Sequence, residues 1–338
     1  MDTNILKEIA MKLVSPGKGI LAADESDQTI KKRFDAIGVE SSPENHRIYR
    51  QLLFKTEGIE EFISGVILFD ETVRQKSDEG ITLPDLLNKK GIVPGIKVDM
   101  GTEEITPGSI EKKTNGFEGL DDRLDEYKGM GAQFTKWRAV FSISDTTPTD
   151  ELISKNASDL ARYARMAQDH NLVPIVEPEV LMDGSHSIKK CREVTYNVLK
   201  KVFIELSRAK VDIGGMLLKP NMVLPGKENS SKANPMEVAK ATLEVLKQVL
   251  PDEMPGVVFL SGGQSPIEAT VNLNEINKQK DTPWQLSFSY GRALQEPVLK
   301  NWGGVYENIE AAQKAFLFRA RMNSLAREGK YSPDMENT

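Results

Sequence analysis

Cysteine and histidine are scarce in this chain. Among 338 residues there is one cysteine, Cys191, and three histidines, His46, His170 and His186. A single cysteine cannot form an intramolecular disulfide or a CxxC pair, and the histidines lack the short spacings that are typical of zinc ligands. We therefore expect no disulfide framework, no metal site and no cofactor.

Long apolar runs and an excess of positive charge are missing as well. No stretch reaches the roughly 18 apolar residues that a transmembrane helix needs, and residues 1–19 lack the apolar core of a signal peptide. The net charge of −6 and the pI near 5.4 do not favour a surface for nucleic acid or anionic membranes. We expect a soluble cytoplasmic protein that binds neither.

What the sequence does contain is a regular alternation of helical and strand-like segments. A helix is expected over about 3–14 and a short C-terminal tail over about 329–338. Between them lie eight strand-like runs at 19–26, 61–70, 91–99, 131–140, 172–180, 213–223, 256–263 and 285–292. Alternating β and α units predict a parallel sheet, and eight of them fit a single-domain α/β fold, a (β/α)8 TIM barrel over 1–338. The main alternative is a doubly wound open sheet, but 19–26 lacks its GxGxxG turn.

Local signals mark two helix starts and one loop. Ser42 before Pro43 is typical of a helix N-cap followed by proline in the first turn. Ser265 with Glu268 three residues later forms a capping-box pattern. The segment 101–117 is rich in threonine, glycine and lysine, and we expect it to be a loop.

Charged residues gather at the carboxyl ends of the predicted strands. They are Asp24, Lys97, Lys136, Arg138, Glu177, Glu179 and Lys219. A parallel barrel brings these strand ends to one face, where active sites of this fold are built. Any one of these residues could form a structural ion pair, but the set as a whole indicates a polar pocket.

Lys219 is the most unusual of them, because it lies in an apolar run that Pro220 ends. Such a lysine reaches solvent, pairs with an acid or lies in a cavity, where its neutral amine can form a Schiff base with a ketone or aldehyde. Lys136, if close, would favour the neutral amine by charge repulsion. Otherwise Lys136 pairs with Glu177 or Asp24.

The acidic residues have two possible roles. Glu177 and Glu179 project to the same side of a strand, where their mutual repulsion favours proton uptake and acid/base catalysis. Ion pairs with lysines are the alternative. Asp24 is either a base for a substrate hydroxyl or a cap for the next helix.

Two turns are expected to bind phosphate. SGG follows the seventh strand and SYGR the eighth, and barrels often hold phosphate at these loops through backbone N–H groups and a helix N-terminus. The residues are Ser261, Gly262, Gly263, Ser289, Gly291 and Arg292. A second anionic group across the pocket has the candidates Ser26, Thr29, Arg33 and Lys97. Turn and surface roles are the alternative for both sets.

Seven motifs together carry a resemblance to a known family. They are GKGILAADES (17–26), VPGIKVD (93–99), FTKWRAV (134–140), VPIVEPEVL (173–181), LLKPNMV (217–223), FLSGGQS (259–265) and FSYGRAL (288–294). From about residue 3 to residue 331, the chain resembles class I fructose-1,6-bisphosphate aldolase. The resemblance implies a (β/α)8 barrel, usually homotetrameric, that uses a lysine Schiff base and no metal. It implies reversible retro-aldol cleavage of a phosphorylated sugar, fructose 1,6-bisphosphate, into dihydroxyacetone phosphate and glyceraldehyde 3-phosphate in glycolysis and gluconeogenesis.

The resemblance also implies residue roles. Lys219 corresponds to the Schiff-base lysine and Glu177 to the principal acid/base. Asp24 corresponds to the carboxylate at the C4 hydroxyl, and Lys136 and Glu179 tune and orient the reacting pair. The ketone-side phosphate site corresponds to Ser261, Gly262, Gly291 and Arg292, with Ser289 beside it. The other phosphate end corresponds to Ser26, Arg33, Lys97 and Arg138.

Two segments depart from the family pattern. After DES the family usually has TGS, whereas this chain has Asp27, Gln28 and Thr29, which adds an anion near the second phosphate site. The best-known members end in a mobile tail whose terminal tyrosine assists proton exchange at the enamine carbon, whereas this sequence reads YSPDMENT from Tyr331 onward. We expect cleavage with slower enamine protonation, and the choice between the bisphosphate and fructose 1-phosphate stays open.

Other functions explain fewer of these residues. A transaldolase-like or deoxyribose-phosphate-type lyase would account for Lys219 but not for both phosphate loops or the glutamate pair. A non-catalytic barrel would not be expected to keep Asp24, Lys136, Glu177 and Lys219 together. A metal-dependent aldolase is disfavoured because no histidine lies at a strand end.

Overall fold

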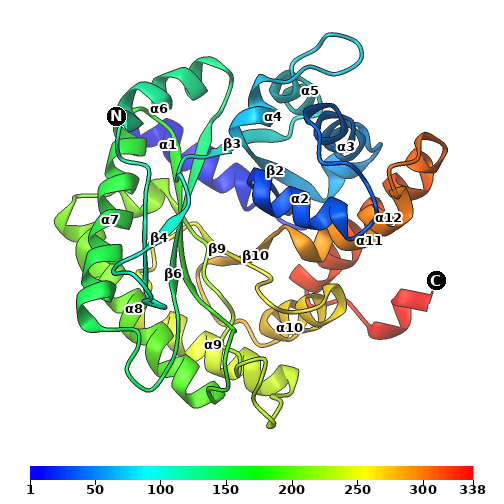
Figure 1. The fold of residues 1–338 in the computed structure, drawn as a ribbon. Coiled ribbons are helices and arrows are strands. Elements are labelled where there is room, and N and C mark those ends of the chain that lie inside the picture. Colours follow the sequence, from blue (N-terminus) through cyan, green and yellow to red (C-terminus); the bar gives the residue numbers. More distant parts are fainter. Residues whose placement is uncertain (338) are drawn as a thin grey trace.

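The computed structural model describes residues 1–337. Within them, eight parallel strands close into a barrel in the order β1-β10-β9-β8-β7-β6-β3-β2 (Figure 1). The barrel strands are β1 (Gly19–Ala23), β2 (Ile63–Leu68), β3 (Val93–Lys97), β6 (Phe134–Phe141), β7 (Val173–Val180), β8 (Leu217–Leu218), β9 (Gly256–Phe259) and β10 (Gln285–Tyr290). The predicted (β/α)8 fold is confirmed.

Helices surround the barrel (Figure 1). The α-helices are α1 (Thr3–Leu13), α2 (Asp27–Asp35), α3 (Pro43–Lys55), α4 (Asp70–Arg74), α5 (Leu83–Lys89), α6 (Leu120–Gly129), α7 (Asp150–Asp169), α8 (Ile188–Arg208), α9 (Pro235–Val249), α10 (Pro266–Lys278), α11 (Arg292–Trp302) and α12 (Ile309–Arg327). The 3-10 helices are η1 (Ile59–Glu61), η2 (Ile213–Gly215), η3 (Tyr306–Asn308) and η4 (Pro333–Asn337). No helix within residues 1–337 is long and apolar enough to cross a membrane.

Both predicted helix starts are confirmed. Ser42 Oγ accepts the Asn45 N–H at 3.3 Å at the start of α3, with Pro43 in the first turn. At α10, Ser265 and Glu268 satisfy each other's backbone N–H groups in a capping box. These contacts satisfy N–H groups that the helix itself leaves without partners.

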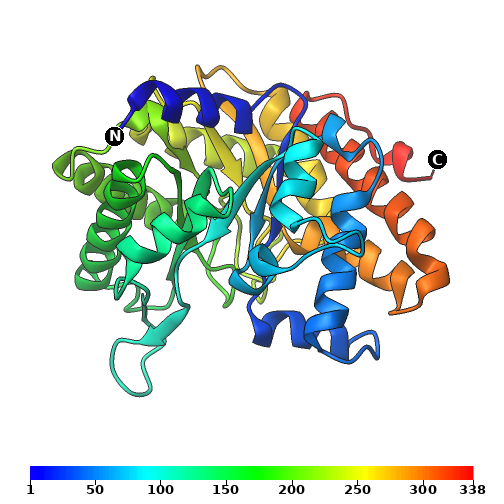
Figure 2. The same cartoon turned by 90° about the horizontal axis from the view of Figure 1, so that it is seen from above.

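The lower part of the barrel interior is apolar, and α1 closes it. Side chains alternate along a strand, so every second residue points inward. The inward apolar residues are Ile20, Ile67, Val93, Phe134, Val173, Ile175, Leu217 and Val258, and Leu6, Ala10 and Leu13 of α1 pack against them. Gly95 makes room here, because a Cβ at this position would lie 2.3 Å from the Phe134 ring. Figure 2 shows α1 lying across this end of the barrel.

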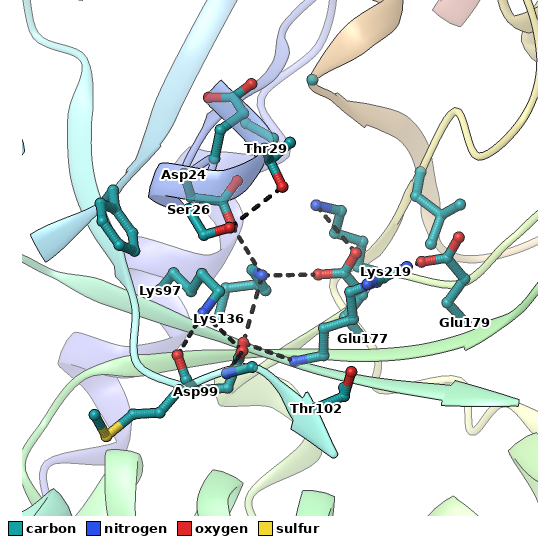
Figure 3. Close-up of a pocket in the computed structure, with 18 of the residues that line it drawn as sticks. Asp24, Ser26, Thr29, Lys97, Asp99, Thr102, Lys136, Glu177, Glu179 and Lys219 are labelled. Carbon is teal, nitrogen blue, oxygen red and sulfur yellow. Dashed lines mark hydrogen bonds and ion pairs between the residues drawn. The ribbon is translucent and has the colours of Figure 1, made fainter. Parts of the chain in front are cut away.

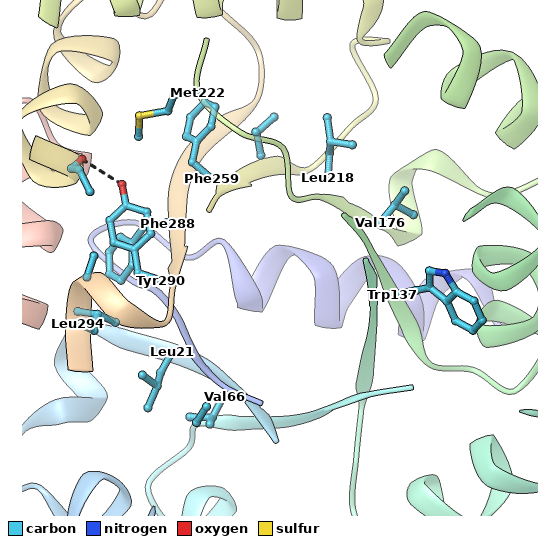
Figure 4. Packing of buried hydrophobic residues seen from close by; sticks show 14 of the residues in the cluster. Leu21, Val66, Trp137, Val176, Leu218, Met222, Phe259, Phe288, Tyr290 and Leu294 are labelled. Carbon is cyan, nitrogen blue, oxygen red and sulfur yellow. Dashed lines mark hydrogen bonds between the residues drawn. The ribbon is translucent and has the colours of Figure 1, made fainter. Parts of the chain in front are cut away.

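The outward strand residues form a second layer against the helices. Figure 4 shows this layer around Val66, Trp137, Val176, Phe259 and Phe288. The Trp137 ring stacks on a tyrosine of α7, with the ring centroids 5.4 Å apart. Two apolar layers therefore hold each barrel strand, one inside the barrel and one beneath the helices.

Two predicted segments were wrong in detail. The expected strand 213–223 is the 3-10 turn η2 followed by the two-residue strand β8, and Lys219 comes directly after that strand. The expected loop 101–117 contains an antiparallel hairpin of β4 (Thr102–Glu104) and β5 (Lys112–Thr114), which projects from the end of the barrel opposite α1 (Figure 2). Polar three-residue strands have no apolar alternation that a sequence could reveal.

The expected C-terminal tail is anchored to α12 through Glu336. The Arg319 guanidinium pairs with both Glu336 oxygens at 2.6 Å, and the Tyr331 hydroxyl donates to Glu336 Oε1 at 2.8 Å. The last residue of the expected tail, Thr338, lies outside the described residues.

Candidate active site

A cavity of about 1200 Å³ opens at the carboxyl ends of the barrel strands. Fifteen of the residues predicted from sequence line it: Asp24, Ser26, Thr29, Arg33, Lys97, Lys136, Arg138, Glu177, Glu179, Lys219, Ser261, Gly262, Ser289, Gly291 and Arg292. All sixteen predicted residues lie within the described chain, and Gly263 is the one that does not line the cavity. A Cβ on Gly263 would lie 2.1 Å from Lys227 Cε, so this glycine faces another side chain.

Lys136 is the electrostatic centre of the cavity. Its Nζ lies 2.8 Å from Asp24 Oδ2, 3.4 Å from Glu177 Oε2 and 3.5 Å from Asp99 Oδ2 (Figure 3). Burial by itself lowers the pKa of Lys136, but these three carboxylates outweigh burial and raise it. Lys136 is therefore a fixed cation that holds several acids in place. It pairs with both Asp24 and Glu177, the alternative that the sequence offered to a role in charge repulsion.

Asp24 is held in its ionised form by the same cluster. Burial by itself would raise the pKa of Asp24, but the charges of Lys136 and Lys219 outweigh it and keep the pKa well below its usual value. Ser26 is the N-cap residue of α2. Asp24 therefore faces the cavity with a carboxylate instead of capping the next helix.

Glu177 lies between the two lysines, with one oxygen toward each. Its Oε1 is 3.5 Å from Lys219 Nζ, and both side chains are 5% exposed. Its Oε2 lies 3.4 Å from Lys136 Nζ but accepts no hydrogen bond from any residue within 1–337. The Lys136 contact is thus an ion pair without hydrogen-bond alignment. A buried carboxylate with spare acceptor capacity next to an amine can take up a proton from it.

Glu179 has a partner of its own. As predicted, it projects to the same side of β7 as Glu177, and both residues line the cavity. Its Oε2 accepts from Arg138 Nε at 2.6 Å. Arg138 follows Lys136 on the inward side of β6, so two cation–carboxylate pairs lie one above the other across β6 and β7.

Asp99 is a site residue that the sequence interpretation missed. It is 6% exposed, and its Oδ1 lies 2.7 Å from Lys97 Nζ. Its oxygens also accept the N–H groups of Gly101 and Arg138, each at 3.2 Å. Burial raises its pKa, but Lys136 and Lys97 outweigh burial and lower it. The strand-end rule that selected Lys97 applied equally to Asp99, two residues later.

The two predicted phosphate loops lie side by side and are tied together. Arg292 Nη2 donates to Gly262 O at 3.1 Å and to Gln264 O at 2.6 Å. Because α11 begins at Arg292, its N-terminus, where N–H groups lack helical partners, lies at the cavity edge. Ser289 Oγ is buried and has no hydrogen-bond partner among residues 1–337. These groups are suited to hold an anion.

The second group of anion-binding candidates lies on and before α2, except for Lys97 at the end of β3. Ser26 Oγ and Thr29 Oγ1 are 3.2 Å apart, and Arg33 pairs with the buried Glu25. Glu25 also accepts from Gln295 Nε2 at 2.7 Å and pairs with a second arginine from α3. Sequence interpretation missed this buried network, which orients Arg33 toward the cavity.

The chemistry available here is that of an amine nucleophile among acids and fixed cations. Lys219 supplies the amine, Glu177 a proton acceptor and Lys136 a permanent positive charge. Both sets of anion-binding candidates line the same cavity. Among residues 1–337, no group of three or more histidines, cysteines or acids is placed to hold a metal ion. The cavity is suited to a carbonyl compound that carries phosphate.

Comparisons with known proteins agree over nearly the whole chain. A family model described as fructose-bisphosphate aldolase class-I matches residues 5–338. The cytosolic fructose-bisphosphate aldolase 4 of Arabidopsis thaliana is 52% identical over 323 residues, which are 95% of this chain and 82% of that protein. Fructose-bisphosphate aldolase 1 of Toxoplasma gondii is 53% identical and covers 96% and 90% of the two chains. A solved structure of fructose-bisphosphate aldolase from Plasmodium falciparum has a TM-score of 0.96 and 51% identity, with 98% and 96% of the chains covered. The chain belongs to the family of class I fructose-bisphosphate aldolases.

Proposed function

We propose that Lys219 is the residue through which this aldolase forms its Schiff base with fructose 1,6-bisphosphate. The observation that carries the proposal is the position of the Lys219 amine. It lies buried in the cavity, 3.5 Å from Glu177, while Lys136 is held in its charged form by three carboxylates. Lys136 contacts three carboxylates that keep it charged, whereas Glu177 is the acid that Lys219 contacts among residues 1–337. Lys219 is therefore the better nucleophile.

Glu177 is proposed to move the protons of Schiff-base formation. As Lys219 Nζ attacks the C2 carbonyl, the amine loses a proton and the oxygen gains one, which gives a carbinolamine. Loss of that hydroxyl as water needs a second proton, and it leaves the iminium. A single carboxyl group beside the nitrogen can accept the proton that the amine loses and later donate it to the departing hydroxyl, while the oxygen takes its first proton from water.

Asp24 is proposed to act in the cleavage step. When the C4 hydroxyl gives up its proton, the C3–C4 bond breaks and its electron pair moves into the iminium to form an enamine. Glyceraldehyde 3-phosphate leaves, and the enamine takes a proton at C3. Because Lys136 keeps Asp24 ionised, this carboxylate is always able to accept from the hydroxyl. Lys136 also stabilises negative charge that develops near Asp24 and Glu177.

Two anion sites are proposed to hold the two ends of the substrate. The ketone-side phosphate is assigned to the loops joined by Arg292, with the free hydroxyl of Ser289. The far phosphate is assigned to Ser26, Thr29, Arg33, Lys97 and Arg138, which line the same cavity. Phosphates held at both ends fix the position of the C3–C4 bond between Lys219 and Asp24.

The setting of the reaction is proposed from the family. The family name implies a role in glycolysis, and we extend it to gluconeogenesis because the aldol reaction is reversible. A cytoplasmic location is supported by the cytosolic relative of Arabidopsis thaliana. A homotetramer is proposed on the resemblance alone, and sedimentation or light scattering would measure it.

Reductive trapping tests the central assignment. The protein is incubated with dihydroxyacetone phosphate and borohydride, and the modified peptide is mapped by mass spectrometry. We expect a stable adduct at Lys219 that a chelator does not diminish, and no adduct in the Lys219→Arg variant. Lys97 and Lys136, in the same cavity, are internal controls. An adduct at either of them, or none in folded protein, would overturn the assignment.

A further inference from the structure

His46 lies outside the active-site cavity and connects a serine to a glutamate. Its Nε2 is 2.8 Å from Ser41 Oγ, and its Nδ1 is 2.9 Å from Glu71 Oε1. Ser41 precedes α3, His46 lies in the first turns of α3, and Glu71 lies in α4. Neither the aldol chemistry nor the phosphate sites use these residues.

The acid determines which ring nitrogen carries the proton. An ionised carboxylate only accepts hydrogen bonds, so the Nδ1 that faces Glu71 is protonated. In the neutral ring Nε2 is then an acceptor, and the Ser41 hydroxyl donates to it. This is the arrangement in which a histidine can remove a proton from a serine as a general base.

The histidine ring is held in this orientation from several sides. It is 7% exposed, and the Phe34 ring of α2 packs edge-on against it, with the centroids 5.5 Å apart. Gln75 Nε2 donates to Glu71 Oε1 at 3.2 Å and so fixes the acid. The charged neighbours in α3, Glu44 and Arg47, pair with each other at 2.6 Å. Among residues 1–337, the charged group that pairs with the imidazole is Glu71.

We propose that Ser41 is an activated nucleophile that accepts acyl groups from small aryl esters or acyl thioesters. A nucleophile hydrogen-bonded to a base, which in turn is oriented by an acid, is the signature of such a residue. Ser41 is partly exposed, whereas His46 is buried behind it. The proposal thus adds an acylation site to this aldolase and is independent of the aldol reaction.

The atoms balance without a further reactant. Ser41 Oγ attacks the acyl carbon while its proton moves to His46 Nε2. The bond from that carbon to the phenolate or thiolate breaks, and His46 returns the proton to the leaving group. The product is an ester on Ser41, and Glu71 stays ionised and stabilises the imidazolium during the transfer.

The chain offers matched controls for this site. Ser42 is the adjacent hydroxyl, but its Oγ accepts from a backbone N–H as the cap of α3. His170 also touches acids, yet both of its ring nitrogens face carboxylates, Asp125 at 2.6 Å and Asp121 at 3.1 Å. Neither residue has the serine–histidine–acid order.

The test is acetylation of the full-length protein by p-nitrophenyl acetate, followed by peptide mapping over time. We expect Ser41 to be acetylated at least about tenfold faster than Ser42, because a general base typically contributes 10²–10⁴-fold. His46→Gln and Glu71→Gln should each remove this advantage, whereas His170→Gln should keep it.

Two checks separate the site from unspecific labelling. Hydroxylamine cleaves a serine ester but leaves acetyl-lysine amides intact, and aldolase activity should be unchanged by Ser41→Ala. If His46→Gln does not fold, Glu71→Gln serves instead, and it should likewise lose the faster acetylation of Ser41 relative to Ser42. Acetylation of Ser41 at the Ser42 rate, or a Ser41 rate that survives in both variants, would overturn the proposal.

Discussion

The two ends of the barrel interior have opposite character, although the same strands build both. Along the inward side of β7, the residues change from Val173 and Ile175 to Glu177 and Glu179. β6 changes in the same way, from Phe134 to Lys136 and Arg138. Phe134 and Lys136 are only two positions apart. A single step along a strand thus separates the apolar packing over α1 from the charged lining of the cavity.

The difference shows which part of the interior stabilises the fold. Burying a large apolar side chain contributes about 1.5–3 kcal/mol, so the lower end provides stability. Buried ion pairs contribute little net stability, because the cost of removing charges from water offsets their attraction. The charges of the upper end are therefore best explained by chemistry.

One buried charge at the lower end sharpens the comparison. Arg327 is 3% exposed, and its guanidinium donates to the carbonyl oxygens of Val14, Ser15 and Lys18 after α1. Burial lowers its pKa to about 10. Lys136 contacts carboxylates, whereas Arg327 contacts backbone carbonyls and holds the segment that follows α1. A buried cation thus holds the carboxylates of the proposed active site at one end and the segment that closes the barrel at the other.

The largest effect is expected from Lys136→Met. This change leaves three buried carboxylates without their shared cation, so kcat should fall by about 10²–10³-fold. The free energy of unfolding should fall by about 3–5 kcal/mol, as for a broken buried ion pair. Steady-state kinetics and denaturant titration measure the two quantities. Lys113→Met, which removes a partly exposed lysine of the β4–β5 hairpin, should change neither quantity. A wild-type kcat in Lys136→Met would contradict the catalytic role of the upper end.

Asp99→Asn should alter the pH dependence of stability. Lys136 and Lys97 lower the pKa of Asp99 below its ordinary value of 3.8, despite burial. A carboxyl whose pKa is lower in the folded state stabilises the fold above its ordinary pKa, and this contribution is lost as pH falls through the folded value. The variant should be less stable at pH 7, by on the order of 1–3 kcal/mol.

The loss of stability below about pH 4 should then be shallower in Asp99→Asn than in the wild type. Denaturant unfolding between pH 7 and pH 3 measures both curves. Asp252→Asn, at an exposed aspartate, should keep the wild-type slope. An identical acid limb in Asp99→Asn would show that the buried aspartate does not depend on the lysines.

The smallest effect is expected at the rim of the cavity. Asp27 lies in the first turn of α2 beside the proposed far phosphate site and is exposed. Asp27→Thr should lower KM for fructose 1,6-bisphosphate by roughly two- to fivefold, the size of one exposed charge interaction. The difference should shrink at high salt. Asp35→Asn at the far end of α2 should leave KM unchanged. An equal decrease of KM in Asp35→Asn would show that the effect does not depend on closeness to the phosphate site.

Much of the fold followed from local patterns. Apolar runs and capping residues such as Ser42 and Ser265 depend only on neighbouring residues, so the barrel strands and several helix starts could be predicted. β8 could not, because its length is set by pairing with β7 and β9 and not by its own apolar run. The hairpin at 102–114 is also set by contacts that its polar sequence does not reveal.

The candidate site shows the same limit. Lys219 and Glu177 were identifiable because charge at a strand end is unusual. Glu25 was missed because its partners lie in α2, α3 and α11, and only the closed barrel brings them together. Asp99 was missed although its position obeyed the rule that selected Lys97. Sequence therefore predicted which residues face the cavity better than which partners hold them there.

The most direct test of the division between the two ends compares Ile175→Ala with Glu177→Gln, two residues apart on the inward side of β7. We predict that Ile175→Ala lowers the free energy of unfolding by about 2–5 kcal/mol and leaves the kcat of the folded protein unchanged. Glu177→Gln should lower kcat by about 10²-fold or more, with a smaller loss of stability. If Ile175→Ala lowered kcat as much as Glu177→Gln, or if Glu177→Gln retained wild-type kcat, the division of the barrel interior into a stabilising end and a catalytic end would be contradicted.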